Sequence, residues 1–560
     1  MHDRPLRLAV AVVVLFAAGC SAAPPVARDA ETPHAHLTVA DGGMPPLFDD
    51  LGDYHRPVTT ASGRAQAYFD QGLRLVYGFN HVEAQLAFRE AVRADPDCAM
   101  GYWGIALTSG SNYNSPTDAA RERLAYQAIQ GARALASRAS AVERALIDAL
   151  AARHSARADA ARATLDRGYA DAMREVARRF PDDADASTLF ADAMMNLRPW
   201  NLWAADGQPH PGTPEILAAL EHVLAMNPYH PGANHLYIHA VEASPQPARG
   251  IAAADRLAAL MPGAGHIVHM PSHVYLRVGR YGDAIDVNVR AVAADRAYFA
   301  RRAPSPIYRM GYYPHNIDFI WHAAGMEGRS AETIRAARDL AAAVPIEALS
   351  EMPDMEGFHA APLFALVRFG RWSETLGQPA PPAGTKYLTG AWRYTRGLAF
   401  AATGRREEAR HELAELRSLV ESLPTARTVA QFFTMRDMLV LAADVLAGEM
   451  AARAGQTDVA VRHLTQAVAA QDRHWFTEPP PWYFPVRHSL GAALLEAGRA
   501  AAAEAVYRED LRRNPENGWA LFGLAASLRA QGKTAEAEAA DRRFQRAWSR
   551  ADVTLPASRF

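Results

Sequence analysis

Small and apolar residues recur along the chain with a spacing that predicts pairs of helices. Within residues 65–98 the recurring positions are occupied by Tyr68, Gly72, Leu75, Ala84, Phe88, Ala91 and Pro96. Counted from Ala65 as position 1, they are positions 4, 8, 11, 20, 24, 27 and 32. The same frame returns near the C-terminus at Gly491, Leu494, Ala503, Tyr507 and Pro515. A repeat of 34 residues predicts a stack of similar helical units.

This spacing resembles that of the tetratricopeptide repeat, a pair of antiparallel helices in which small residues at positions 8 and 20 let the helices approach closely. Glycine followed by a basic residue, as at Gly279-Arg280 and Gly404-Arg405, marks the turns between helices. The resemblance implies an all-α, right-handed superhelical solenoid whose concave face is built from the first helix of each pair. Such folds usually bind a molecule in that concavity, but the fold alone decides no chemistry.

Extra residues interrupt the repeat around 197–213, 300–314, 376–388 and 474–485. Insertions in a solenoid tend to lie on a binding face. We expect an N-terminal tetratricopeptide-like array over residues 61–330 and a C-terminal array over residues 331–560. Trp200 and Trp203 of the first insertion are candidates for the rim of the groove, with packing between repeats as the alternative.

Residues 1–19 have the pattern of a bacterial lipoprotein signal peptide. Arg4 and Arg7 precede a continuous apolar stretch over residues 8–19, which is shorter than the roughly 20 residues that a membrane-spanning helix needs. The stretch ends at Cys20 in a sequence that resembles the lipobox, where the cysteine is lipidated. The resemblance implies an exported, periplasm-facing or cell-surface protein, attached to a membrane only through the lipid on Cys20. An ordinary secreted protein that is cleaved nearby is the alternative.

Residues 20–60 are rich in proline and lack helical periodicity, so we expect a tether or an arm that lies on the body.

The 560 residues carry 59 basic and 61 acidic side chains, and this balance argues against a nucleic-acid partner. The chain has two cysteines, which excludes a disulfide framework and a cysteine zinc cluster. Motifs of ordinary kinases, dehydrogenases and serine hydrolases are missing from the sequence.

Nine of the 21 histidines lie between His210 and His315. Two HxxxH pairs, His235 with His239 and His269 with His273, each place two imidazoles one helical turn apart on the same face. The two pairs are 34 residues apart, so they occupy positions 5 and 9 of consecutive repeats. In the family that the chain resembles, these positions face the concave groove, as do positions 2 and 12, which are occupied here by His266 and Glu242.

Neighbouring first helices should lie about 8–10 Å apart, which lets histidines from both converge on one divalent transition metal, either copper, zinc or iron. The expected ligands are His235, His239, His266, His269 and His273, with Glu242 beside them. Paired HxxxH motifs on facing helices also look like the ligand geometry of coupled binuclear copper proteins, whose fold is different. Pro271 argues against this geometry, because a helix that begins only there would separate His269 from His273.

His315 and His359, each at position 4 of its repeat, are further candidates that could approach the site from later repeats or could cap loops.

Two functional classes follow from the predicted metal site. In the binding class, the groove captures a peptide, a protein or a small molecule, and the metal is structural or is the cargo. In the enzyme class, a copper, iron or zinc oxidoreductase has an open coordination position, with Glu242 or His315 as a proton carrier.

We prefer the binding class, because no carboxylate in the sequence stands out as a base. An open coordination position beside a deep pocket would reverse this preference. The third alternative is a metal-free scaffold in which the stripe of histidines binds a peptide.

Overall fold

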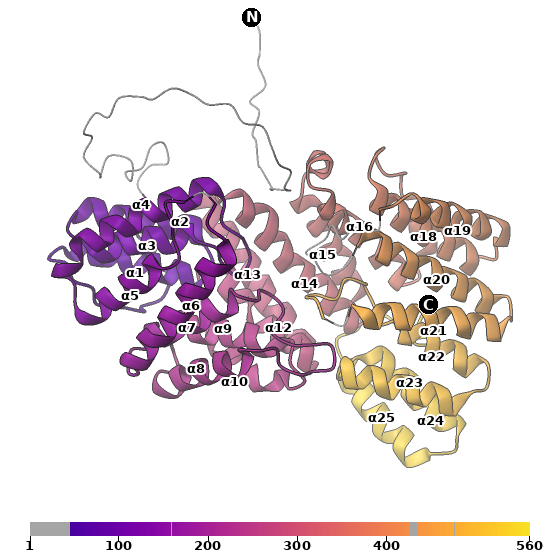
Figure 1. Ribbon diagram of the computed structural model, residues 1–560. Coiled ribbons are helices and arrows are strands. Elements are labelled where there is room, and N and C mark those ends of the chain that lie inside the picture. The colour runs from indigo at the N-terminus through magenta and orange to yellow at the C-terminus, as the bar shows by residue number, and fades with distance from the viewer. Residues whose placement is uncertain (1–44, 158, 425–433, 475) are drawn as a thin grey trace, which may run out of the picture. The chain divides into compact units, whose positions relative to one another are not determined.

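The computed structural model describes residues 45–157, 159–424, 434–474 and 476–560 (Figure 1). The predicted signal peptide, Cys20 and the first part of the proline-rich arm lie outside these residues. Over the described ranges the chain is helical, and its extended pairings are two isolated bridges, Asn112 with Ser115 and Trp203 with Pro209. None of the described helices combines the length and the apolar character that crossing a membrane requires.

Fourteen α-helices lie in the half of the described chain that contains the histidine pairs. They are α1 Gly63–Tyr77, α2 His81–Ala94, α3 Ala99–Ser109, α4 Ala119–Leu135, α5 Ala141–Ala151, α6 Arg162–Arg179, α7 Ala184–Met195, α8 Thr213–Met226, α9 Pro231–Glu242, α10 Ile251–Leu260, α11 Gly265–His269, α12 Pro271–Val278, α13 Tyr281–Arg301 and α14 Tyr313–Met326. A single π-helical turn, Tyr308–Tyr312, leads into α14.

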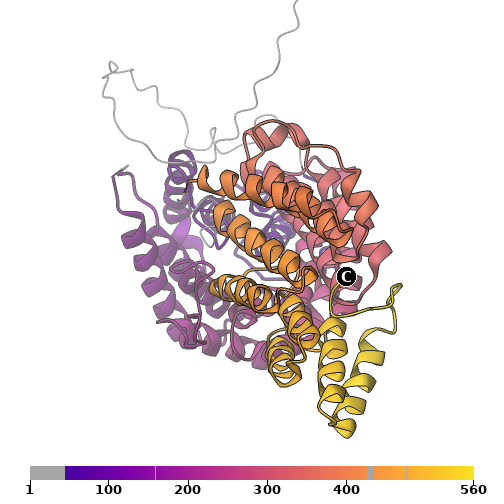
Figure 2. The same ribbon diagram turned by 90° about the vertical axis from the view of Figure 1, so that its right-hand side faces the viewer.

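The later helices follow the repeat more regularly. They are α15 Ser330–Ala343, α16 Glu356–Arg368, α17 Trp372–Leu376, α18 Lys386–Ala402, α19 Arg406–Glu421, α20 Met435–Arg453, α21 Thr457–Arg473, α22 Arg487–Glu496, α23 Ala500–Arg513, α24 Gly518–Ala530 and α25 Thr534–Ala547. Each helix packs mainly on its neighbours in the chain, as the orange and yellow helices of Figure 2 show. The predicted all-α solenoid of helix pairs is therefore confirmed.

The small residue at position 8 of the repeat lets the two helices of a pair approach closely. A Cβ atom on Gly72 of α1 would lie 2.6 Å from the ring of Phe88 on α2. A Cβ atom on Gly491 of α22 would lie 2.3 Å from the ring of Tyr507 on α23. Gly404 between α18 and α19 has a φ of +79°, which glycine adopts without strain. These contacts explain why the spacing seen in the sequence predicts the fold.

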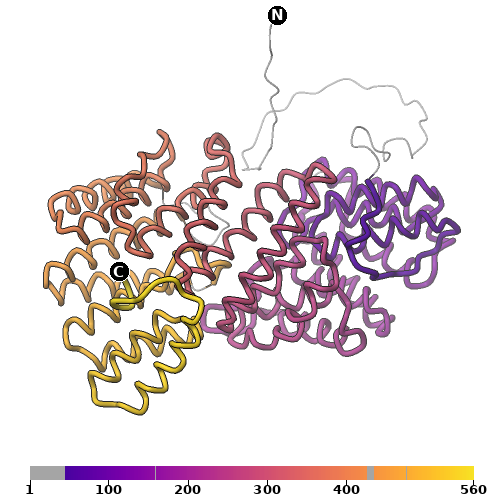
Figure 3. The backbone as a smooth tube through the Cα atoms, turned by 180° about the vertical axis from the view of Figure 1, so that it is seen from behind, coloured from indigo at the N-terminus to yellow at the C-terminus, as the bar shows by residue number. Residues whose placement is uncertain are grey.

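Two irregular segments lie on the helices. Residues 45–60 are irregular and lie on the helices, where Arg56 donates to Asp183 at 2.8 Å and to Asp185 at 2.7 Å. At the other end, residues 551–560 run back along the helices (Figure 3). There Ser558 donates to the carbonyl of His488 at 2.7 Å. Both ends of the described body are thus held by specific polar contacts.

Candidate metal centre

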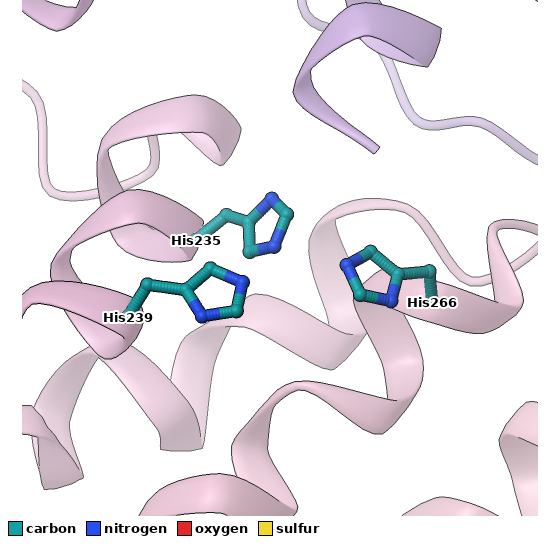
Figure 4. Close-up of side chains that lie close together, drawn as sticks. All are labelled: His235, His239 and His266. Carbon is teal, nitrogen blue, oxygen red and sulfur yellow. The ribbon is translucent and has the colours of Figure 1, made fainter. Parts of the chain in front are cut away.

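Three helices bring the predicted histidines together. His235 and His239 lie one turn apart on α9, His266 and His269 lie on α11, and His273 lies on α12. None of the five side chains is more than 3% exposed. Figure 4 shows the rings of His235 and His239 turned toward the ring of His266 on the facing helix. We expected these residues to line an open groove, but packing against neighbouring aromatic rings buries them.

The chain keeps a helical course through the proline that follows α11. Met270 has φ and ψ of −52° and −35°, and its N–H donates to the carbonyl of His266 at 3.1 Å. Pro271 is the first residue of α12, where a helix needs no N–H. His269 and His273 therefore stay on one face, with their Nε2 atoms 2.7 Å apart. The separation that Pro271 led us to consider does not occur.

Ligand atoms from eight residues gather into three groups, and within each group all the atoms lie within 4.8 Å of one another. The histidine groups are His235, His239 and His266 (the first group), and His269, His273 and His315 (the second group). The third group, His239, Glu242, His273 and Glu478, contains members of both. The structure therefore presents two separate sets of three imidazoles, where the sequence alone suggested one.

The outlying histidine candidates have different positions. The half-buried His315 on α14 joins the second group, with its ring centroid 4.9 Å from that of His269. His359 on α16 is in none of the groups that the described residues form. Its Nε2 instead lies 2.9 Å from the carbonyl oxygen of Val344. The prediction that His359 approaches the site is therefore not supported, because this local hydrogen bond holds the side chain elsewhere.

The two tryptophan candidates also lie in different surroundings. The ring of Trp200 packs edge-on against the ring of His239, with 5.3 Å between centroids. Trp203 is buried, and its indole N–H donates to the carbonyl of Ala240 at 2.8 Å. Trp200 thus belongs to the surroundings of the first group, whereas Trp203 packs against the backbone of α9 and is no rim residue.

Acceptors orient four of the imidazoles. In each ring Nδ1 lies close to an oxygen atom of another residue. On α9, Nδ1 of His235 lies 2.6 Å from the carbonyl oxygen of Tyr77, and Nδ1 of His239 lies 2.8 Å from Oε1 of Glu242. On α11 and α12, Nδ1 of His269 lies 2.6 Å from Oδ1 of Asn288, and Nδ1 of His273 lies 2.5 Å from Oε2 of Glu242. Carbonyl and carboxylate oxygens only accept, so in a neutral ring the proton is on Nδ1 and the lone pair on Nε2. Metal-ligating histidines commonly have this arrangement.

Glu242 occupies a central place in this arrangement. Its two oxygens accept from His239 of the first group and from His273 of the second group. One carboxylate therefore fixes the orientation of a ligand in each set of three. The sequence placed Glu242 at the end of the histidine stripe, and the structure shows that it can act through the rings that it orients.

The opposite ring nitrogens lack partners. Nε2 of His235, Nε2 of His239 and both nitrogens of His266 are buried without a hydrogen-bond partner among the described residues. Nε2 of His269 and Nε2 of His273 face each other, and two lone pairs at 2.7 Å repel unless a proton or a cation lies between them. Each unsatisfied buried group costs about 1–3 kcal/mol. A cation that accepted these lone pairs would remove that cost.

Burial keeps the imidazoles neutral. It lowers the pKa of His235, His239, His266 and His269 well below the usual value, and neighbouring imidazoles add to the effect. For His315, burial lowers the pKa to about 3. A metal ion needs deprotonated ligands, so these rings are already in the binding form at neutral pH.

Burial has the opposite effect on the two carboxyl groups of the third group. It raises the pKa of Glu242 to about 8, and it raises the pKa of Glu478 well above its usual value, with the neighbouring Glu242 as the next cause. Burial therefore opposes the ionised form of both groups, which is the form in which Glu242 accepts from both imidazoles. A bound cation would lower both pKa values again.

Three of the four predicted insertions reach the site. Trp200 belongs to the insertion over residues 197–213, Tyr312 to the one over residues 300–314, and Glu478 to the one over residues 474–485. The ring centroid of Tyr312 lies 4.6 Å from that of His266. Glu478 Oε2 lies 2.5 Å from His273 Nδ1. We did not predict Tyr312 or Glu478, and the interruption of the repeat was the only sequence signal that could have pointed to them.

A cavity of about 800 Å³ lies beside the second group. His273, Phe319 and Glu478 line it together with residues of α12, α13 and the insertion over residues 474–485. The first group is covered differently, since the ring of Phe79 stacks on His239 and His266 at 5.7 and 5.6 Å. The second group is thus the one that a small molecule can approach.

No family model matches the chain. No curated protein matches it either. Among solved structures, the chain is similar to the human IFIT1 dimer with m7Gppp-AAAA, at 13% identity and a TM-score of 0.30, over 87% of this chain and 91% of that one. It is also similar to the Cut9–Hcn1 hetero-tetramer of APC/C, at 12% identity and a TM-score of 0.29, over 88% and 78% of the two chains. Neither likeness bears on function, and the helix pairs of this chain are themselves what identify a solenoid of tetratricopeptide-like repeats.

Proposed function

We propose that this chain is a metal-dependent enzyme, an oxidoreductase, whose centre consists of two transition-metal ions, each held by three histidines. Two observations carry the proposal. Ring nitrogens of His235, His239 and His266 are buried without a partner in the described part of the chain, and Nε2 of His269 lies 2.7 Å from Nε2 of His273. Two disjoint groups of three imidazoles provide for one ion each. Copper, zinc and iron all suit imidazole ligands.

Three protein ligands leave an open coordination position, which is typical of catalytic metal sites. The cavity beside His273 gives a substrate access to such a position in the second group. This cavity is the reason to prefer an enzyme over a protein that only binds or carries the metal. When bound, the ions would supply activation of dioxygen, water or a carbonyl group. The residues of the chain would orient the ligands through Glu242 and shield the centre from bulk water.

Metal analysis of the purified chain, loaded separately with copper, zinc or iron, tests the proposal. We expect two ions per chain in the wild type and a loss of at least one in His239→Ala and in His273→Ala. His359→Ala is the matched control and should retain both ions, because His359 bonds to Val344 away from the groups. Equal metal content in all four proteins would refute the metal centre and leave the metal-free peptide scaffold as the remaining interpretation.

We further propose that the chain is exported and anchored through a lipid on Cys20. The apolar segment over residues 8–19 and the lipobox-like sequence that ends at Cys20 support this part of the proposal. Cys20→Ser should move the protein from the membrane fraction to the soluble fraction. Continued membrane association of that variant would show that another feature holds it. This test is independent of the metal centre.

A further inference from the structure

The cavity beside the second histidine group contains hydrogen-bond donors that no described part of the protein satisfies. Nε of Arg277, the hydroxyl of Tyr281 and the indole N–H of Trp482 are buried, and none of them has a partner among the described residues. All three residues line the cavity. Each of these three can donate to a ligand that carries acceptors. Glu478 lines the same cavity and adds two buried carboxyl oxygens without a hydrogen-bond partner among the described residues.

Arg277 is the cation among these donors. Its guanidinium lies over the ring of Phe476, 5.6 Å from the centroid, and Nη2 donates a long hydrogen bond of 3.5 Å to the carbonyl of Ser244. Within the described ranges it forms no direct ion pair with a carboxylate. Burial lowers its pKa, and the attraction of Glu242 and Glu478 only partly opposes that shift. A guanidinium whose Nε is buried without a partner is costly. Such an arginine is typical of a site that receives an anion from outside the protein.

The other arginines that line the cavity differ from Arg277, because each of them forms a direct ion pair. Arg487 pairs with Asp472 at 2.6 Å, while Arg512 and Arg513 each pair with Glu509 at 2.7 Å. Within the described ranges, Arg277 is therefore the arginine of the cavity wall that has no ion pair of its own. The planar guanidinium fork of an arginine matches a carboxylate in a bidentate pair.

We propose that this cavity binds an organic carboxylate with an apolar body, whose carboxylate group is held by Arg277. The body would pack on the aromatic rings of Phe319, Phe476 and Trp482, which line the same cavity. The volume of about 800 Å³ is in the range of small-molecule sites and admits either a short peptide with a free C-terminus or an aromatic acid. That this ligand is the substrate rests on the proposed metal centre, which borders the cavity at His273.

Calorimetric titration of the full, metal-free chain tests the proposal with two pairs of probes. One pair is 3-phenylpropanoate and its primary amide, and the other is an Ala-Phe-Phe tripeptide and its C-terminal amide. In at least one pair we expect the acid to bind at least tenfold more tightly than the amide. The pair with the larger ratio shows whether a free acid or a peptide terminus is the preferred source of the carboxylate.

Variants locate the carboxylate. Arg277→Met should reduce the affinity for the acid to that for the amide, Arg277→Lys should keep part of the preference, and Tyr281→Phe should weaken binding a few-fold. Arg487→Met is the matched control and should keep the preference within twofold, because Arg487 already pairs with Asp472. Should Arg277→Met fail to fold, Arg277→Lys and Tyr281→Phe still test whether these side chains hold the carboxylate, since neither variant removes a core contact.

Three outcomes would overturn the proposal: no probe binds, acid and amide bind equally well in both pairs, or Arg277→Met keeps the preference. The protein is free of metal in these titrations, so they give an answer whether or not the chain holds ions. A failure of the metal analysis and a failure of carboxylate binding are therefore separate results.

Discussion

His235 and His488 occupy the same position of the repeat in two different regions of the molecule, and both are fully buried. Around His488, Nε2 lies 3.0 Å from Asp510 and Nδ1 lies 3.1 Å from Arg368, so the protein satisfies both ring nitrogens. His235 has an acceptor on Nδ1, the carbonyl of Tyr77, and no described partner on Nε2. Repeat position and burial therefore do not mark a metal ligand. The proposed ligands differ from His488 in having a ring nitrogen that lacks a described partner or faces another imidazole nitrogen.

The surroundings differ in the same way. His488 lies on α22, and the pKa of this ring is lowered first by burial, while Asp510 opposes the shift. The first and second histidine groups lie where insertions and α14 add Trp200, Tyr312 and His315 to the repeat. In the first case the repeat builds its own complete hydrogen-bond network. In the second case several buried ring nitrogens have no hydrogen-bond partner among the described residues.

Metal loading should produce the largest effect. If ions bind the folded chain, a free concentration 1,000-fold above Kd stabilises it by about 4 kcal/mol per ion. Thermal unfolding followed by calorimetry should therefore show a large rise in Tm when copper or zinc is added to the metal-free wild type. The double variant His239→Ala/His273→Ala lacks a ligand in each group and should show little rise. An equal rise in both proteins would contradict the assignment of the two groups.

The next largest effect concerns the satisfied histidine. His488→Phe should lower the free energy of unfolding by about 3 kcal/mol, because it removes one donor to the buried Asp510 and the acceptor of the buried Arg368. Its metal content should equal that of the wild type, since His488 belongs to neither histidine group. Chemical denaturation and metal analysis of the same preparation check both points. A lower metal content in this variant would contradict the distinction between His488, which the protein satisfies, and His235, which is a proposed ligand.

The carboxylate that connects the two groups should have an intermediate effect. Glu242→Gln can accept from only one of the two Nδ1–H groups that Glu242 now satisfies, so one ligand loses its orientation. Such changes weaken metal binding about 10- to 100-fold. Competition with a chelator measures the affinity. Glu221→Gln is the control, because Glu221 accepts from Tyr237 of α9 at the surface, and it should bind metal like the wild type.

The smallest effect has an unusual sign. His266→Phe should raise the stability of the metal-free chain by about 1 kcal/mol, because it removes two buried ring nitrogens that have no described partner. The phenyl ring can keep the contacts with Phe79 and Tyr312. The variant should also lose one ion. Denaturation in the presence of a chelator gives the stability, and a loss like that of His488→Phe would show that His266 is a structural histidine.

The local part of the site could be predicted from the sequence. The spacing of His235 with His239, and of His269 with His273, depends only on the 3.6-residue turn of a helix and on the length of the repeat. The same reasoning cannot say which later segment approaches these helices. Glu478 follows His273 by more than 200 residues, and its approach depends on how all the intervening repeats and one insertion pack.

By itself, the sequence determined the helical repeat and the stripe of histidines on consecutive units, because both follow from periodic, short-range geometry. Tertiary packing alone decided that the rings form two groups, that Trp203 and His359 are in neither of them, and that a large cavity borders the second. It also decided which ring nitrogens find an acceptor. Those outcomes depend on contacts between distant segments, whose distances and burial no local pattern encodes.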